Sequence, residues 1–248
     1  MPAFIPGSAQ RAKRPRDVGR WCDADYFDGL ADPRGYSDLR YDHRKGYGLT
    51  FWSDGFLGTA RTLAKRYSPL GTFLELGCAK GFLVQALRMV GVEAYGVDIS
   101  GYALSCSHPD ICQFLHRQSA ADLSNLPDSY FDLVWSWDFM EHLDEAEIVA
   151  CLGESLRVGR RRVVHNLTVF DREYGSIAQA FPDEPQDPTH VSCHTKGWWA
   201  KLVREFVPAE RIRAIEYIGE SFREDAPRRA MLTVDLWAGE FIGEDADA

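Results

Sequence analysis

The sequence lacks the long hydrophobic run that a membrane-spanning helix requires. No stretch approaches the roughly 18 consecutive apolar residues that such a helix needs. The N-terminus also lacks the apolar centre of a signal peptide. We therefore expect a protein that has no membrane partner and stays in the cytoplasm.

Paired cysteines and excess positive charge are scarce as well. The six cysteines are scattered without a CxxC pair, which is typical of free thiols in a reducing compartment. Lys and Arg number 28 against 37 Asp and Glu, so the formal net charge is -9. Because affinity for nucleic acid depends largely on clustered Lys and Arg, this balance argues against a nucleic-acid partner.

One stretch nevertheless indicates a nucleotide-like ligand. Residues 73–76 form a short apolar run typical of a buried parallel strand, and Gly77 and Gly81 bracket the loop that follows. Apolar residues then recur at helical spacing from Leu83 to Val90. A second apolar run ends at Asp98, where a carboxylate can bind two ribose hydroxyls.

Two nucleotide fingerprints are missing from this loop. A dinucleotide-binding loop would place glycines at positions 79 and 82, which hold Ala79 and Phe82. There is also no Walker lysine followed by Ser or Thr, as a phosphate-cradling loop requires. The loop therefore favours neither NAD nor a nucleoside triphosphate.

The remaining pattern, E-x-G-x-x-x-G with a later acid, resembles the S-adenosylmethionine site of class I methyltransferases. The resemblance covers roughly positions 70 to 165 and includes Ala121-Asp122-Leu123, Phe131-Asp132-Leu133-Val134 and Met140-Glu141-His142-Leu143. Ala79 departs from the family, in which many members carry a middle glycine. The resemblance implies an α/β fold: a doubly wound, mostly parallel seven-stranded sheet with helices on both faces, an antiparallel last strand and an N-terminal aromatic lid.

The resemblance also implies a set of cofactor-binding residues. Tyr47, between two glycines, is expected to approach the cofactor, and Asp122 to accept a hydrogen bond from the adenine amine. For Asp122 the alternative is a loop carboxylate that caps a turn. The full predicted set is Tyr47, Glu75, Gly77, Cys78, Gly81, Asp98, Ile99, Ala121, Asp122, Trp137 and His142.

Composition divides the chain into four parts. Residues 1–20 read as a flexible basic tail, with an arm for nucleic acid or an acidic partner as the alternative. Residues 21–68, rich in aromatics, are expected to form a helical lid or cap, or else a packing flap without ligand contact. The methyltransferase domain is predicted at 69–240 with a substrate-side insertion at 168–196, and an acidic tail follows at 241–248.

Periodicity predicts the individual elements. Helices are expected at 53–67, at 100–107, from Glu141 and His142 onward, and at 197–207. Further strands are expected at 114–117, 131–137, 161–166, 212–218 and 231–237. Parallel strands meet their ligands beyond their carboxyl ends, so residues 137–140 are expected to line the pocket floor.

His190, in the insertion, is the candidate catalytic residue. Its unshifted pKa near 6.5 would let it take a proton from an acceptor at neutral pH, with Asp187 and His194 as candidate orienting partners. The alternative is a histidine that only anchors the loop. A metal site from Asp138, Glu141, His142 and His190 is an alternative, because the first three would share one helical face, but no metal is predicted.

The resemblance thus implies an enzyme that transfers a methyl group from S-adenosylmethionine to a small-molecule acceptor. We expect an O-methyltransferase of a secondary-metabolite or sugar-type hydroxyl. The alternatives are an RNA or protein methyltransferase, possibly assisted by a metal, and a non-catalytic binding module. The sequence leaves open the acceptor, the methylated atom and the oligomeric state, for which a homodimer is one alternative.

Overall fold

The computed structural model describes residues 55–174, 189–218 and 229–239. The predictions for the basic tail, Tyr47, most of the lid, Asp187 and the acidic tail lie outside these residues. Within the part of the chain that is described, no helix is both long enough and apolar enough to cross a membrane.

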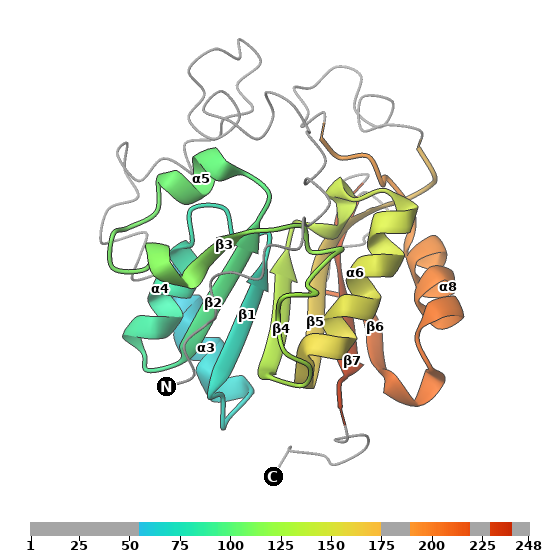
Figure 1. Cartoon of the computed structure of the whole chain (residues 1–248). Coiled ribbons are helices and arrows are strands. Elements are labelled where there is room, and N and C mark those ends of the chain that lie inside the picture. The colour runs from blue at the N-terminus through green and yellow to red at the C-terminus, as the bar shows by residue number, and fades with distance from the viewer. Residues whose placement is uncertain (1–54, 175–188, 219–228, 240–248) are drawn as a thin grey trace.

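A seven-stranded sheet organises the described residues, with the strand order β3-β2-β1-β4-β5-β7-β6 (Figure 1). Strands β1 to β5 pair in parallel, whereas β7 is antiparallel to both β5 and β6. This arrangement confirms the predicted sheet and its antiparallel last strand. The strands are β1 (Thr72–Leu76), β2 (Glu93–Asp98), β3 (Leu115–Arg117), β4 (Phe131–Trp137), β5 (Gly159–Phe170), β6 (Ile212–Tyr217) and β7 (Arg229–Trp237).

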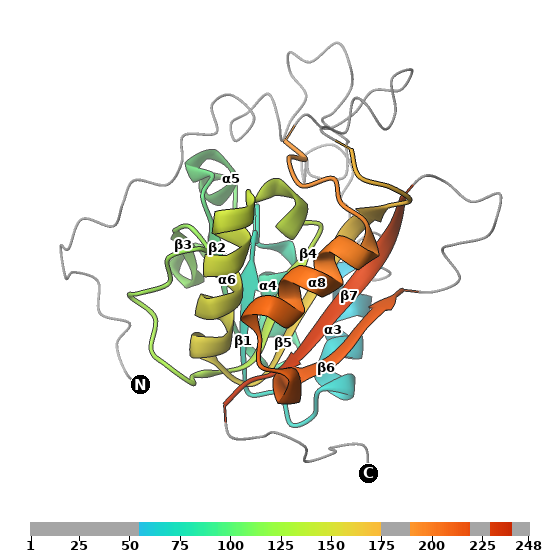
Figure 2. The same ribbon diagram turned by 90° about the vertical axis from the view of Figure 1, so that its right-hand side faces the viewer.

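Helices cover both faces of this sheet, as predicted. Figure 2 shows α6 and α8 on the face nearer the viewer, and α3 and α4 on the other. Strand β1 is apolar toward both layers: Leu74 packs in the cluster that contains Trp199 of α8, and Phe73 in the cluster that contains Leu63 of α3. The helices are α3 (Phe56–Arg66), α4 (Phe82–Met89), α5 (Gly101–Ser105), α6 (Glu145–Val158) and α8 (Lys196–Phe206).

The helix after β4 begins later than the sequence analysis predicted. Residues Met140–His142 form a 3-10 turn, η4, and α6 starts only at Glu145. The cause is a capping box, in which the side chains of Asp144 and Glu147 each accept a hydrogen bond from the other residue's backbone N–H. Glu141 and His142 therefore do not open a helix.

Strand β5 is longer than predicted and runs through Phe170 into the expected insertion. Its pairing partner β7 explains the extension, because the antiparallel register continues from Arg162 opposite Trp237 to Phe170 opposite Arg229. The third strand is shorter than expected, since a 3-10 turn occupies Cys112–Phe114. Neither change moves the carboxyl ends of β1, β2 and β4.

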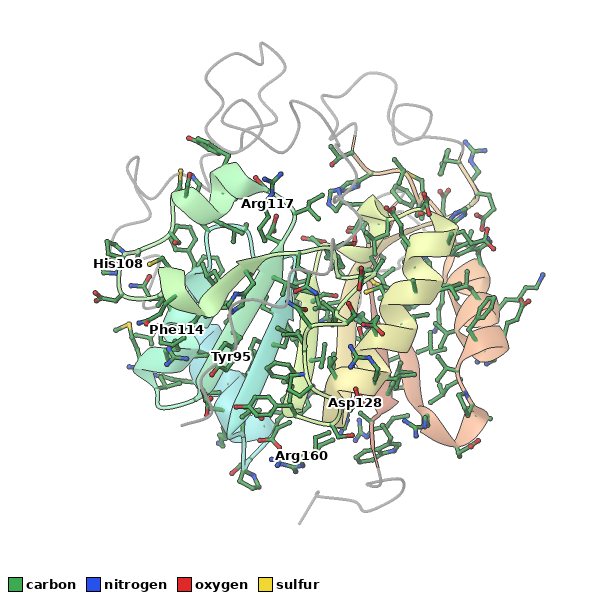
Figure 3. All side chains as sticks on the ribbon, viewed as in Figure 1. Tyr95, His108, Phe114, Arg117, Asp128 and Arg160 are labelled. Atoms are coloured by element: carbon green, nitrogen blue, oxygen red, sulfur yellow. The ribbon has the colours of Figure 1, made fainter. Side chains whose placement is uncertain are left out.

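Ion pairs hold the end of the sheet that lies opposite those carboxyl ends. Arg160 pairs with the buried Asp132, whose carboxylate also accepts hydrogen bonds from the backbone N–H groups of Gly71 and Thr72 at the start of β1. Arg157 pairs with Asp128 and Glu154. Figure 3 shows Asp128 and Arg160 at this end and Arg117 toward the other, near α5.

Candidate cofactor and acceptor site

The glycine loop joins β1 to α4 in a left-handed backbone conformation. The φ angles of Gly77, Ala79 and Gly81 are 70°, 48° and 75°. A Cβ atom at Gly77 would overlap the ring of Phe139, and one at Gly81 would lie 2.6 Å from Leu115 Cδ1. Glycine is required at both positions, and Ala79 keeps the backbone conformation that a glycine would adopt there.

Asp98, the last residue of β2, fixes this loop. Its Oδ2 accepts a hydrogen bond from the backbone N–H of Ala79 at 2.8 Å, and its Oδ1 accepts one from Ser100 at 2.7 Å. Burial raises the pKa of Asp98, whereas these two N–H groups and the charge of nearby His142 act in the opposite direction. Asp98 thus ties the loop after β1 to the loop after β2.

Glu75 places a second buried carboxyl group beside Asp98. Burial, and then the charge of Asp98, raises the pKa of Glu75 well above its usual value, while the Val84 N–H of α4 lowers it. The Glu75 Oε2 atom is buried and has no hydrogen-bond partner among the described residues. Burial and the same two acids also raise the pKa of the Cys78 thiol. A cation bound at this loop would favour the ionised forms of the two carboxyl groups, so the site suits a cationic ligand.

The predicted cofactor residues Ile99, Ala121 and Asp122 follow the carboxyl ends of β2 and β3. The carbonyl oxygen of Ile99 accepts a hydrogen bond from Arg117 Nε at 3.0 Å. The backbone N–H of Gln118, just after β3, donates to the Asp98 carbonyl at 3.0 Å and so brings Ala121 and Asp122 to this side of the sheet. Asp122 Oδ1 accepts from Ser124 N at 3.3 Å, which is the turn-capping contact of the alternative interpretation.

The carboxyl end of β4 carries a strained, exposed acid. Asp138 has a φ angle of 47°, which is uncommon for a residue with a side chain, and its N–H donates to Asn166 O at 3.0 Å. Thr168 Oγ1 lies 3.3 Å from Asp138 Oδ1. The preceding Trp137 is 48% exposed. This end of β4 therefore offers an apolar ring and a carboxylate beside each other.

Glu141 is buried in the η4 turn, and its hydrogen bonds connect this turn to β5 and to residues 191–192. Its Oε1 accepts a hydrogen bond from Thr168 N at 3.1 Å, and its carbonyl oxygen accepts from Val191 N and Ser192 N at 3.0 Å each. Burial and the charge of Asp138 raise the pKa of Glu141 to about 8. Burial thus favours the protonated form of this carboxyl group in the folded protein.

His142 and His190 come together, although 48 positions separate them in the sequence. Their rings meet edge to face with centroids 4.6 Å apart, and His142 Nδ1 lies 2.7 Å from Thr189 Oγ1. The structure therefore brings the predicted catalytic residue next to a predicted cofactor residue.

The structure does not form the helical face on which the alternative metal site depends. Asp138, Glu141 and His142 do not share a helical face, because η4 is a short 3-10 turn that ends before α6. In residues 55–174, 189–218 and 229–239, no group of three or more His, Cys, Asp or Glu side chains is arranged to hold a metal ion.

The predicted role of His194 as an orienting partner is not supported by its contacts. His194 Nδ1 lies 2.6 Å from Glu173 Oε2, and its ring stacks on Trp198 with centroids 3.7 Å apart. Glu173 also accepts hydrogen bonds from Thr195 N and Oγ1, the N-cap of α8. These contacts make His194 an anchor for the start of α8.

Sequence reasoning missed Thr189 and Thr168 as parts of this site. No local pattern marks either residue, because each is identified only by a partner on another segment, His142 for Thr189 and Glu141 for Thr168. The contact of Phe139 with Gly77 did leave a signal, since a glycine directly after a buried strand indicates a close approach.

The fold and the glycine loop with its two acids are those expected of a class I, S-adenosylmethionine-dependent methyltransferase. Residues 74–164 match the family described as "Methyltransferase domain". The chain therefore carries a methyltransferase domain over these residues, and such a domain implies S-adenosylmethionine as the cofactor. No curated protein matches the sequence.

Solved structures share the fold at low sequence identity. A SAM-dependent methyltransferase from Archaeoglobus fulgidus is 17% identical with a TM-score of 0.52, over 77% of this chain and 100% of that one. Magnesium protoporphyrin IX methyltransferase from Synechocystis PCC 6803 with bound SAH is 15% identical, TM-score 0.51, over 80% and 90%. Geranyl diphosphate methyltransferase in complex with GPP and sinefungin is 12% identical, TM-score 0.53, over 73% and 77%.

Proposed function

We propose that the protein transfers a methyl group from S-adenosylmethionine to a hydroxyl of a small-molecule acceptor, with His190 as the base. The observation that carries this proposal is the position of His190. Its ring contacts His142, whose charge acts on Asp98 in the cofactor half of the site. In this arrangement His190 would be the proton acceptor on the acceptor side of the bound cofactor.

The residues of the glycine loop fit the charges of the cofactor. S-adenosylmethionine carries an ammonium group and a sulfonium group, and two buried carboxyls, Glu75 and Asp98, lie beside the loop. The Glu75 Oε2 atom, which has no partner among the described residues, can accept a hydrogen bond from the ammonium group. Asp98 can bind the ribose hydroxyls through lone pairs that its two backbone contacts leave available.

His190 would remove the proton that the acceptor loses. When bound, S-adenosylmethionine supplies a methyl carbon on a positively charged sulfur, so an oxygen lone pair can form the C–O bond while the C–S electron pair returns to sulfur. The acceptor hydroxyl then carries an extra positive charge unless its proton leaves. His190 takes that proton on a ring nitrogen, and alignment by the pocket supplies much of the remaining acceleration.

A small acceptor is supported by the surface beyond β4. Two apolar side chains are half exposed near this end, Trp137 at 48% and Val191 at 50%, and can contact an apolar acceptor. The net charge of -9 disfavours a polyanionic substrate. Two proteins with the same fold act, by their descriptions, on geranyl diphosphate and magnesium protoporphyrin IX.

We also propose that the protein is located in the cytoplasm, in keeping with its scattered cysteines.

A panel of small hydroxyl acceptors, followed by release of adenosylhomocysteine, tests this proposal. Each reaction should run at pH 6 to 9, with and without a chelator, on the wild type and on Asp98→Ala. We expect turnover with at least one hydroxyl compound, unchanged by the chelator and greatly reduced in the variant. Methylation confined to amines, RNA or protein, or complete loss of activity with the chelator, would contradict it.

A further inference from the structure

The η4 turn contacts the glycine loop on one side. Phe139, which precedes the turn, packs its ring so closely on Gly77 that a Cβ atom there would overlap it. His142, which ends the turn, lies close enough to Asp98 for its charge to lower the pKa of that carboxyl. A ligand that orders Gly77 and Asp98 therefore also restricts the two ends of this turn.

The same turn holds the loop that carries His190. The Glu141 carbonyl accepts hydrogen bonds from Val191 N and Ser192 N, both at 3.0 Å. His142 Nδ1 meets Thr189 Oγ1 at 2.7 Å, and the His142 ring meets the His190 ring edge to face. The segment 189–192 is thus held by contacts to one short turn, and two of the four residues meet the side chain of His142.

We propose that η4 couples cofactor binding to the position of the acceptor loop, with His142 as the positioning residue. This inference rests on the proposed function of the site. His142 itself transfers no proton in this scheme. It holds Thr189 and His190 where the methyl group arrives, and it does so most strongly when the cofactor fixes Asp98 and Phe139.

Such coupling has a thermodynamic consequence that does not require a known acceptor. If the bound cofactor stabilises the contacts of η4, the opening of segment 189–192 becomes rarer, because every opening must then break contacts that the cofactor supports. Coupling between two sites is typically about 5- to 150-fold in an equilibrium constant. The amides of Val191 and Ser192 report this opening directly, since both donate to Glu141.

Hydrogen exchange of the full-length protein with adenosylhomocysteine as the probe tests the coupling. Two variants remove the link from its two ends, His142→Leu and Thr189→Val; the second leaves every group of the cofactor half in place. His194→Ala is the matched control, because it removes a histidine of the same loop that contacts Glu173 and Trp198 instead. Calorimetry of the same samples gives the affinity for the probe.

We expect the probe to slow exchange at Val191 and Ser192 at least about fivefold in the wild type and in His194→Ala. In Thr189→Val the probe should bind with wild-type affinity but slow this exchange less than about twofold. His142→Leu should lose the protection of Val191 and Ser192 to the same extent. Equal protection in the wild type and Thr189→Val, or no protection in the wild type despite binding, would overturn the coupling. Failure of the wild type to bind the probe would refute the proposed function, and the coupling with it.

Discussion

The two halves of the site are held in different ways. In the cofactor half, the loop after β1 and the end of β2 are joined by hydrogen bonds from the backbone N–H groups of Ala79 and Ser100 to a single carboxylate, Asp98. In the acceptor half, the Glu141 carbonyl accepts hydrogen bonds from Val191 N and Ser192 N, and the side chain of His142 adds contacts with Thr189 and His190.

This difference determines how each half responds to change. The cofactor half depends on backbone conformations that few residues can adopt, so its residues are constrained by the fold itself. The acceptor half adds side-chain contacts, those of His142 with Thr189 and His190, that can be exchanged without altering the sheet. A protein built in this way can keep one cofactor while its acceptor changes, which agrees with the range of substrates named for structures of the same fold.

The largest expected effect lies in the acceptor half, at His190. A general base contributes about 10²- to 10⁴-fold, so His190→Ala should lower kcat by that factor while the affinity for adenosylhomocysteine stays unchanged. Steady-state kinetics on the acceptor found by the screen measures the effect. His194→Ala should keep wild-type kcat, because its contacts are with Glu173 and Trp198. Near-wild-type turnover of His190→Ala from pH 6 to 9 would reduce His190 to a loop anchor.

The cofactor half should respond to Asp98→Ala in binding rather than in turnover alone. Loss of two charge-assisted hydrogen bonds to ribose should weaken S-adenosylmethionine binding by about 2 to 4 kcal/mol. Asp98→Asn is the matched control, because an amide oxygen can still accept one of the two backbone hydrogen bonds that hold the loop. Calorimetry on both variants distinguishes the lost charge from a lost loop. Wild-type affinity in Asp98→Ala would contradict the assignment of this acid.

Lowering the pH should decrease the stability of the folded protein through His165, which lies in the sheet beneath the acceptor half. This histidine is buried in β5, its Nδ1 lies 2.9 Å from Ser136 Oγ, and burial lowers its pKa to about 4. Above pH 6.5 the ring is neutral in both states and contributes nothing, whereas between pH 6.5 and 4 only the unfolded chain takes up the proton. The wild type should therefore lose about 3 kcal/mol of unfolding free energy across this window.

Denaturant unfolding at several pH values measures the acid effect. His165→Gln has no titrating ring, so the stability of this variant should fall less steeply from pH 6.5 to 4 than that of the wild type. Equal slopes in the two proteins would show that His165 becomes protonated without loss of the fold, and the sheet below the acceptor half would then be less rigid than its burial indicates.

A smaller effect sharpens the comparison on the cofactor side. Gly77 and Gly91 both have a positive φ, 70° and 91°, but only Gly77 has a neighbour, Phe139, within reach of an added Cβ. Gly91→Ala should cost about 1 to 2 kcal/mol of stability and leave cofactor affinity unchanged. Gly77→Ala should cost more than that and also weaken adenosylhomocysteine binding. Identical behaviour of the two variants would mean that Phe139 moves aside freely.

The same contrast explains how much the sequence could predict. Strand β4 was predicted with its observed bounds, because an apolar run buried on both faces is a local signal. The glycine loop and Asp98 were likewise found from local spacing. The start of α6 was missed although Asp144 and Glu147 form a capping box, because the expected helix was placed on Glu141 and His142.

The acceptor half was predicted less well, for a physical reason. Its contacts join residues that are distant in the chain, such as His142 and Thr189 or Glu141 and Thr168. No periodicity records such pairs, since they form only when β4 and β5 lie side by side. His190 was proposed from its residue type and its place after the fifth strand. Its contact with His142 could be known only from the fold.

The central claim is that the loop of Gly77 to Gly81, with Glu75 and Asp98, binds S-adenosylmethionine. Calorimetric titration of the wild-type protein with adenosylhomocysteine, and separately with NAD, tests it most directly. We predict saturable one-to-one binding of adenosylhomocysteine and much weaker or no binding of NAD. Tighter binding of NAD, or no binding of adenosylhomocysteine by a folded sample, would contradict this account of the site.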